Sequence, residues 1–188
     1  MAATPLFSHV VFETNRLERM KDWYRDVLHA HVVYEGHNLC FLTFDEEHHR
    51  IAIIEAPDKL EPKQIGANGL HTSAGMHHVS YTFASLENLL ERYAELKTKE
   101  IGPAVCFQHG VTTSMYYADP DSNLVELQIE NFATPAEADA YMHGAEYDAF
   151  PNGPGYSPEA LLAAFQAGVP VDQLTSRAWA ERNPPASH

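Results

Sequence analysis

The stretch GMHHVSYTF, residues 75–83, places two adjacent histidines in front of an alternation of apolar and polar residues. Alternation of this kind predicts a β-strand, and successive side chains of a strand point to opposite faces of its sheet. His77 and His78 therefore cannot serve one site in the same way. A second doublet opens the stretch HHRIAIIE at His48, so the question of which histidine is functional arises twice.

The order of elements around this stretch occurs twice along the chain. A strand pattern with a histidine at residues 7–14 precedes a helical pattern at 15–30, and the strand pattern at 76–83 precedes a helical pattern at 85–99. Three further strand patterns follow each helix. Internal repetition of this kind predicts two copies of one structural module.

The spacing of matching residues supports the repeat. His9 and His78 are 69 residues apart, and the candidate helix N-caps Asn15 and Ser85 are 70 apart. Glu18 follows Asn15 by three residues, which is a capping-box arrangement. Two features with nearly the same offset indicate that His9 and His78 are counterparts.

We therefore predict an α+β fold in which two βαβββ modules form a cupped, barrel-like mixed sheet around one cavity. The modules are expected at about 5–57 and 75–131, within a domain that spans residues 1–131. A linker containing Pro and Gly, residues 56–75, joins them.

The remaining residues, 132–188, are rich in Ala, Pro and Gly and carry no strand pattern. We predict a C-terminal extension with one helix, in which Ser157 is the N-cap, Pro158 lies in the first turn and Gly168 ends the helix. This extension is expected to pack on the outside of the domain, at a candidate contact between subunits of a homo-oligomer.

Composition excludes several classes of protein. The net charge of −14 opposes binding to nucleic acid or to anionic membranes, because both require clustered Lys and Arg. No apolar run is long enough to span a bilayer and the N-terminus has no secretory pattern, so a cytoplasmic location is expected. The only cysteines, Cys40 and Cys106, lie in apolar contexts and are expected to be reduced core thiols.

A candidate metal site follows from the strand alternation. If the two modules pair about a pseudo-twofold axis, His9 and His78 approach each other and His77 points to the opposite face. Glu126 alternates with the apolar residues Val125 and Leu127, so it faces away from the helix-packed core. Two histidines and one carboxylate with open positions form the ligand set of non-haem Fe(II) oxygenases. Taken singly, each side chain could instead be an ordinary strand histidine or a solvent-facing glutamate.

Together these stretches resemble the vicinal oxygen chelate superfamily, and within it the small single-domain type I extradiol ring-cleaving dioxygenases. The resemblance covers roughly residues 5–131. It is carried by FSHVVFET, ERMKDWYRDVL, HHRIAI, HHVSYTF, IGP with a following HG, and MYYADPDSNLVEL. The resemblance implies an enzyme of aromatic hydrocarbon catabolism that uses Fe(II) and O2 to open the ring of a catechol-type diol beside its hydroxyl groups.

The resemblance also implies a role for individual residues. The iron ligands fall on His9, His78 and Glu126. The residues implied to act on substrate and oxygen are His49, His109 and Tyr116. Tyr117 remains an alternative to Tyr116 that faces the other way, and His49 could be a solvated loop residue beside His48.

The chain departs from the two-domain enzymes of that group. It lacks their additional N-terminal pair of modules, its hairpin from His109 to Tyr116 is about two residues shorter, and its C-terminal extension matches no motif. Two other functions remain open: a metal-dependent isomerase or thiol transferase resembling glyoxalases, and a protein of the same fold that only sequesters a small molecule. A glyoxalase-like site needs a carboxylate from each module, whereas Ala52 occupies the place equivalent to Glu126 and Glu55 lies three residues further on.

Overall fold

The computed structural model describes residues 4–56, 61–72 and 74–186, so parts of the predicted linker lie outside the described residues. The chain divides into two compact units, residues 1–64 with 119–123, and residues 65–118 with 124–188. Each unit is described by itself.

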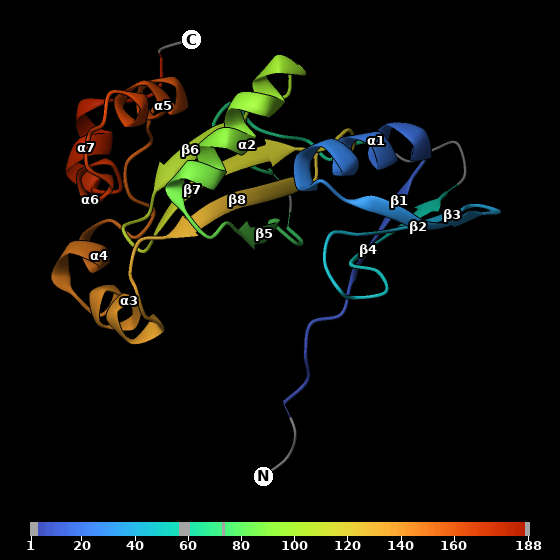
Figure 1. The fold of residues 1–188 in the computed structure, drawn as a ribbon. Helices are drawn as coiled ribbons and strands as arrows, with labels where there is room; N and C mark the ends of the chain where they lie inside the picture. Colours follow the sequence, from blue (N-terminus) through green and yellow to red (C-terminus); the bar gives the residue numbers. More distant parts are fainter. Residues whose placement is uncertain (1–3, 57–60, 73, 187–188) are drawn as a thin grey trace. The chain divides into compact units, whose positions relative to one another are not determined.

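The first unit contains one four-stranded sheet with a single helix (Figure 1). Its strand order is β1-β4-β3-β2, in which β1 and β4 are parallel and the other pairs are antiparallel. The elements are β1 (Val10–Thr14), α1 (Leu17–Leu28), β2 (His31–Gly36), β3 (Leu39–Thr43) and β4 (Ile51–Glu55).

The second unit repeats this arrangement with the strand order β5-β8-β7-β6. The outer pair β5 and β8 is again parallel, and the remaining pairs are antiparallel. The predicted fold of two βαβββ modules with a helical extension is therefore confirmed. The elements are β5 (His78–Thr82), α2 (Leu86–Thr98), β6 (Val105–Gln108), β7 (Thr112–Ala118) and β8 (Leu124–Glu130).

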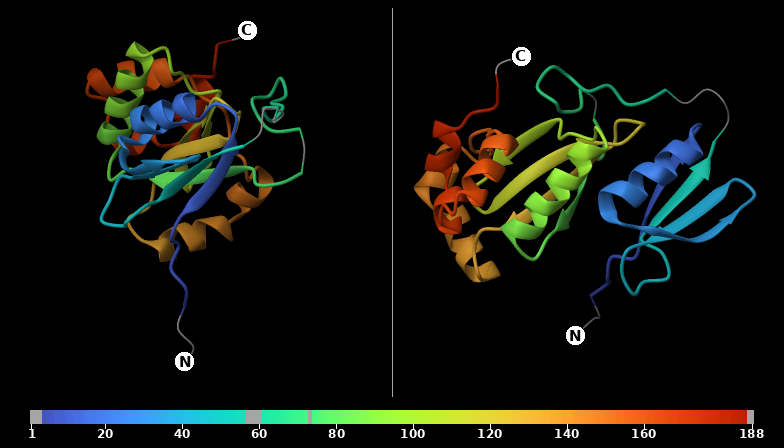
Figure 2. Two further views of the ribbon diagram at one scale, coloured as in Figure 1. Left: turned by 90° about the vertical axis from the view of Figure 1, so that its right-hand side faces the viewer. Right: turned by 45° about the horizontal axis from the view of Figure 1, so that its top comes forward.

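Each helix covers one face of its sheet, as the second view of Figure 2 shows. In the first unit Met20, Tyr24 and Val27 of α1 are fully buried, together with Leu42 and Ile53 of the sheet. Complete burial of one such side chain contributes about 1.5–3 kcal/mol. The same apolar stripe in α2 packs on β8. Each sheet therefore has one core face and one face directed away from its helix.

The two helices begin differently. Ser85 caps α2, because its side chain accepts a hydrogen bond from the backbone N–H of Asn88, as predicted. The predicted cap at Asn15 is wrong: α1 has Arg16 at its N-cap position and no side-chain capping bond. The Asn15 side chain instead accepts a hydrogen bond from the guanidinium of Arg16 at 3.1 Å.

The described part of the C-terminal extension, residues 132–186, contains five helices, so the prediction of a single helix was wrong. The predicted helix is present as α5, with Ser157 accepting from the N–H of Ala160 and Gly168 following in the left-handed conformation. The other four are too short for a periodic apolar pattern or have no buried face. They are α3 (Pro135–Met142), α4 (Ala145–Ala149), α6 (Val171–Leu174) and α7 (Arg177–Arg182), beside α5 (Pro158–Gln166).

The extension covers the edge strand β6. Gly155 forms a β-bridge with Phe107, and the N–H of Gln108 donates to the carbonyl of Pro154 at 2.9 Å. Tyr156 is 1% exposed and donates its hydroxyl hydrogen to the carbonyl of Ser114. Figure 1 shows these helices gathered beside β6 and β7. The extension thus protects an otherwise unpaired strand edge.

Two predictions from composition can be compared with the structure. Cys40 and Cys106 are free and buried, as expected for core thiols. Within the described residues, no helix combines the length and apolar character that crossing a bilayer requires.

The close docking of the extension on β6 predicts a difference between two glycine substitutions. Gly153 and Gly168 both have positive φ, at 67° and 79°. A Cβ at Gly153 would lie 1.9 Å from the carbonyl oxygen of Gln108, whereas nothing lies within 4 Å at Gly168. Gly168→Ala should therefore lower the free energy of unfolding by about 1–2 kcal/mol, and Gly153→Ala by about 2–5 kcal/mol. Urea unfolding measures both, and equal losses would show that the extension readily moves away from β6.

Candidate functional site

The helix-free face of the second sheet carries a buried carboxylate. Glu126 lies on the inner strand β8, where it pairs with Ser80 of β5 and with Tyr116 of β7. Glu126 is only 4% exposed to solvent. Glu126 is therefore an interior acid and not the solvent-facing glutamate of the alternative interpretation.

His78 lies two residues before Ser80 and so shares the face of Glu126. Its Nε2 is 3.1 Å from a carboxylate oxygen of Glu126. The preceding residue, His77, is exposed and contacts His78 from the other side, with the two Nδ1 atoms 2.7 Å apart. The doublet therefore divides its roles: His78 reaches the acid through Nε2, and His77 contacts the opposite nitrogen of the same ring.

Tyr116 and His109 extend this arrangement. The Tyr116 hydroxyl donates to the other carboxylate oxygen of Glu126 at 2.8 Å, and Nε2 of His109 lies 2.9 Å from the same hydroxyl. Four of the six predicted site residues thus form one continuous series of contacts in the order His78, Glu126, Tyr116, His109. Tyr117, the alternative to Tyr116, is buried on the core side of β7.

Hydrogen bonding keeps the acid of this series ionised. Burial raises the pKa of Glu126, but hydrogen bonds from His78, Ser114, Ser80 and Tyr116 outweigh burial and lower the pKa to about 2. The pKa of Tyr116 is raised, first by burial and then by the charge of Glu126. Burial lowers the pKa of His109, although Glu126 and a backbone hydrogen bond with Asn152 oppose that shift. Near neutral pH the site therefore holds a carboxylate beside a neutral phenol.

The other two predicted residues, His9 and His49, come together in the first unit. His9 immediately precedes β1, and its ring centroid lies 4.4 Å from that of His49. His49 is 8% exposed and stacks on Phe41 with a centroid separation of 4.3 Å. Its Nδ1 is 2.6 Å from Nδ1 of His48, and its Nε2 has no hydrogen-bond partner among the described residues. His49 is thus a packed interior ring and not a solvated loop residue.

The environment of His49 favours the neutral ring. Burial lowers its pKa, and the neighbouring His9 and His48 lower it further. A neutral imidazole whose Nδ1 is engaged presents a lone pair or a single N–H at Nε2. Such a ring can accept or return one proton near pH 7.

The strand register explains why the two modules differ chemically. In the first sheet Val11 pairs with Ala52, and in the second sheet Ser80 pairs with Glu126. Since Val11 and Ser80 correspond through the offset between His9 and His78, Ala52 occupies the place of Glu126. Glu55 lies exposed at the end of β4. The first module therefore supplies no carboxylate at the equivalent position, as predicted.

The side chains around Glu126 suit a divalent cation. An ionised, buried carboxylate beside an imidazole nitrogen provides two ligands of the kinds that Fe(II) and similar ions bind. The described residues contain no group of three or more His, Cys, Asp and Glu side chains placed to hold a metal. His78 and Glu126 are adjacent within one unit, whereas the third predicted ligand, His9, belongs to the other unit.

Two hydrogen-bond partners of the acid escaped the sequence analysis. Ser80 and Ser114 both contribute to the low pKa of Glu126. The sequence did contain a signal for both serines, because side chains two residues apart on a strand share a face. Ser80 follows His78 by two residues, and Ser114 precedes Tyr116 by two. Small polar residues at such positions identify a polar sheet face only once the neighbouring strands are known.

Comparison with known proteins gives matches over most of the chain. The family model described as the glyoxalase/bleomycin resistance protein/dioxygenase superfamily matches residues 6–127. Biphenyl-2,3-diol 1,2-dioxygenase 2 of Rhodococcus globerulus is 58% identical over 185 residues, which cover 98% of this chain and 94% of the relative. Biphenyl-2,3-diol 1,2-dioxygenase 3 of the same organism is 51% identical over 180 residues, covering 96% and 92%.

Solved structures show the same fold at low sequence identity. A fosfomycin resistance protein from Mesorhizobium loti has a TM-score of 0.52 and 18% identity, covering 72% of this chain and 98% of that one. A lactoylglutathione lyase from Agrobacterium tumefaciens has a TM-score of 0.52 and 17% identity, covering 68% and 96%. These likenesses concern the fold alone.

The low pKa of Glu126 predicts a specific pH dependence of stability in the metal-free protein. Because the folded-state pKa lies below the ordinary value of 4.5, the stabilisation is complete above about pH 4.5 and is lost as the pH falls towards 2. The difference in free energy of unfolding between the native protein and Glu126→Gln should therefore shift by about 3 kcal/mol across this range. Chemical denaturation at several pH values measures it, and a constant difference would contradict the hydrogen-bonded carboxylate.

Proposed function

Because the chain belongs to the glyoxalase/bleomycin resistance protein/dioxygenase superfamily, we propose that it is an Fe(II)-dependent extradiol dioxygenase that opens a catechol-type aromatic ring with O2. The resemblance to ring-cleaving dioxygenases that the sequence predicted is confirmed by its two near-full-length relatives. The observation that carries the proposal is the pairing of His78 with the buried, ionised Glu126.

The names of the relatives indicate the chemistry to test. A 1,2-dioxygenase acting on biphenyl-2,3-diol cuts between one hydroxyl-bearing carbon and the adjacent carbon that carries the second ring. We propose the same substrate class for this chain: a catechol with a substituent beside the diol. Cleavage next to the hydroxyl pair, and not between the two hydroxyls, defines the extradiol reaction.

We propose that His9, His78 and Glu126 hold the iron. Two imidazoles and one carboxylate leave positions for a chelating diol and for oxygen. When bound, Fe(II) supplies Lewis acidity to the diol and a redox-active centre for O2. The low pKa of Glu126 supports this assignment, because the acid needs no proton removed before a cation binds.

The other site residues would accept, hold or donate protons. His49 is neutral near pH 7 and presents Nε2, so we assign it the acceptance of a catechol hydroxyl proton. The Tyr116 hydroxyl keeps its proton, because its pKa is raised. It donates a hydrogen bond to Glu126 in the metal-free protein and would donate one to a substrate oxygen once Glu126 binds the metal. His109 contacts that hydroxyl at 2.9 Å and orients it. Phe41 supplies an apolar wall on one face of His49.

The alternative functions have less support. A site that needs a carboxylate from each module would find Ala52 in the first module. A protein that only sequesters a ligand would not need an ionised carboxylate held by four hydrogen-bonding side chains. Oxygen uptake with biphenyl-2,3-diol and a panel of substituted catechols tests the proposal. Products that carry both atoms of labelled O2 are expected, and binding without oxygen consumption would refute it.

Metal content separates the two histidines of the second doublet. His78→Ala should abolish Fe(II) binding and ring cleavage, because it removes the nitrogen beside Glu126. His77→Ala should retain one iron per chain, with affinity reduced by up to about 10- to 100-fold through loss of the contact that orients His78. Metal analysis after anaerobic loading measures both variants. Full iron occupancy in His78→Ala would overturn the ligand assignment.

Replacing His49 should affect turnover and not the metal. His49→Phe preserves a ring between His9 and Phe41 but removes the proton acceptor, so turnover should slow by about 10²- to 10⁴-fold. Anaerobic catechol binding should change far less. The matched control, His48→Phe, keeps the His49 ring and should slow turnover by a much smaller factor. Near-normal turnover in His49→Phe would remove this residue from the site, and loss of iron would mean that it is a ligand.

A further inference from the structure

The turn that carries His109 is enclosed by the C-terminal extension, which lies beyond the end of the family-model match at residue 127. A Cβ at Gly110 would lie 2.4 Å from the hydroxyl of Tyr141, so this tyrosine packs directly on the turn. A Cβ at Gly153 would lie 1.9 Å from the carbonyl oxygen of Gln108 and 3.2 Å from Cα of His109. A side chain of the extension, that of Tyr141, and a backbone segment at Gly153 therefore both pack against the turn.

Arg177, the first residue of α7, connects the extension to His109 itself. Its guanidinium donates to the backbone carbonyl of His109 and, at 3.0 Å, to the carbonyl of Glu146. The same group lies over the rings of Tyr141 and Tyr147, 5.6 Å from each centroid. A planar guanidinium can donate in two directions and stack on aromatic rings at the same time, which a lysine cannot do.

The burial of Arg177 is unusual for a cation. The residue is 8% exposed, and its Nε has no hydrogen-bond partner among the described residues. The partners that the described residues offer are carbonyls and aromatic faces, with no carboxylate among them. A buried charge without a counter-ion is unfavourable. An apolar side chain of similar length could be buried without the desolvation penalty of the guanidinium. The arrangement therefore favours a positional role over a purely stabilising one.

The contacts that follow lead from Arg177 to the proposed site. The carbonyl that Arg177 holds belongs to His109, whose ring also has a backbone hydrogen bond with Asn152 of the extension. Nε2 of this ring lies 2.9 Å from the Tyr116 hydroxyl. The main chain and the ring of His109 are thus both held by residues of the extension, while Nε2 of the ring contacts Tyr116.

We propose that Arg177 is a positioning residue, which holds the His109 turn so that the histidine ring meets Tyr116, and that the C-terminal extension is thereby a working part of the site. The role of His109 toward the substrate rests on the proposed function. The position of His109 does not, so it can be tested in the metal-free protein.

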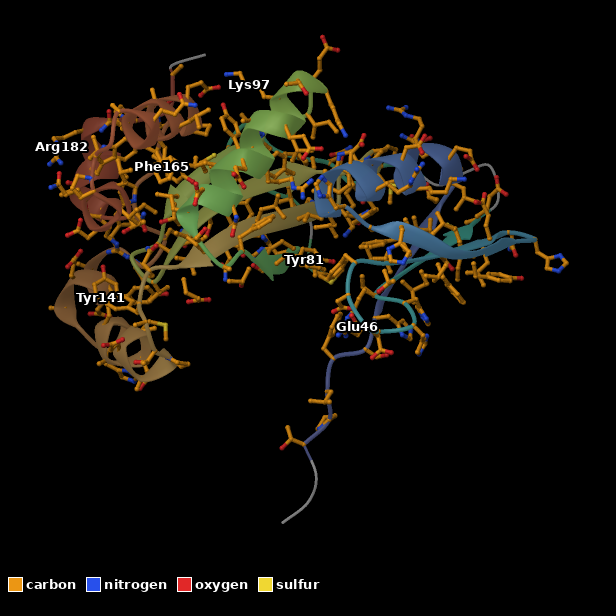
Figure 3. The ribbon with its side chains drawn as sticks, viewed as in Figure 1. Glu46, Tyr81, Lys97, Tyr141, Phe165 and Arg182 are labelled. Carbon is orange, nitrogen blue, oxygen red and sulfur yellow. The ribbon has the colours of Figure 1, made fainter. Side chains whose placement is uncertain are left out.

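The first arm of the test measures structure. Arg177→Met keeps the length of the side chain and removes both donated bonds, and Arg182→Met on the same helix is a matched control because Arg182 is exposed (Figure 3). In Arg177→Met, amide hydrogen exchange at Gln108 and His109 should accelerate by about 10-fold or more, since both amides are hydrogen-bonded in this region. Exchange within α2 and all exchange in Arg182→Met should stay unchanged. The imidazole ¹⁵N signals of His109 should shift only in Arg177→Met.

The second arm measures turnover of biphenyl-2,3-diol by the iron-loaded enzyme. Arg177→Met should lower kcat by about 10- to 100-fold with a much smaller change in KM, because the ring is misplaced and the metal is not. Arg177→Lys, which retains the charge but not the forked geometry, should recover part of this loss. In a His109→Gln background, adding Arg177→Met should cause no further loss, because Arg177 acts through His109.

The two arms distinguish failure of this proposal from failure of the proposed function. Native exchange and native His109 signals in a folded Arg177→Met variant would overturn the positioning role, whatever the enzyme acts on. Additive losses in the double variant would also overturn it, since they would show a structural effect independent of His109. If Arg177→Met does not fold, the same measurements on Arg177→Lys decide the question. Altered His109 signals in a protein that cleaves no catechol would support the positioning role and refute the proposed function alone.

Discussion

A carboxylate that is 4% exposed and still ionised constrains the whole second module, because each of its lone pairs must find a donor. The donors of Glu126 come from both neighbouring strands: Ser80 and His78 on β5, and Tyr116 on β7. Only one pairing register places them together. A shift of one residue would turn Glu126 towards α2 and bring Val125 to the polar face. The hydrogen bonds to Glu126 therefore form only in this pairing register. The low pKa of Glu126 is a consequence of those bonds.

The two modules have the same strand arrangement but carry different side chains at matching positions. In the first sheet Phe41 and Ala52 are paired where the second sheet pairs Tyr116 and Glu126. The substitution of an apolar pair for a polar pair removes one acid and creates a stacking surface for His49. One carboxylate from one module and histidines from both are what a single iron with open positions requires under the proposed function. The repeat therefore provides the same strand arrangement twice and a buried carboxylate at this position once.

Much of this arrangement could be predicted from the chain alone, because strand alternation and a constant offset are local signals. The offset between His9 and His78 identified both modules, and alternation placed Glu126 opposite the core. The extension could not be predicted in the same way, since α4, α6 and α7 have four to six residues and depend on tertiary contacts. A signal for α3 was present in the capping box of Thr134 and Glu137, but that helix has no buried face to give it an apolar period. The role of Arg177 had no sequence signal, because it depends on carbonyl groups from distant segments.

The proposed metal centre requires one iron to bind His78, Glu126 and His9. Crystals of the protein loaded anaerobically with Fe(II) would test it through anomalous scattering measured at the iron absorption edge. A single peak is expected within about 2.2 Å of Nε2 of His78, a carboxylate oxygen of Glu126 and a ring nitrogen of His9. A peak coordinated by His77 in place of His78, or a peak beside Glu126 from which His9 is absent, would overturn this ligand set.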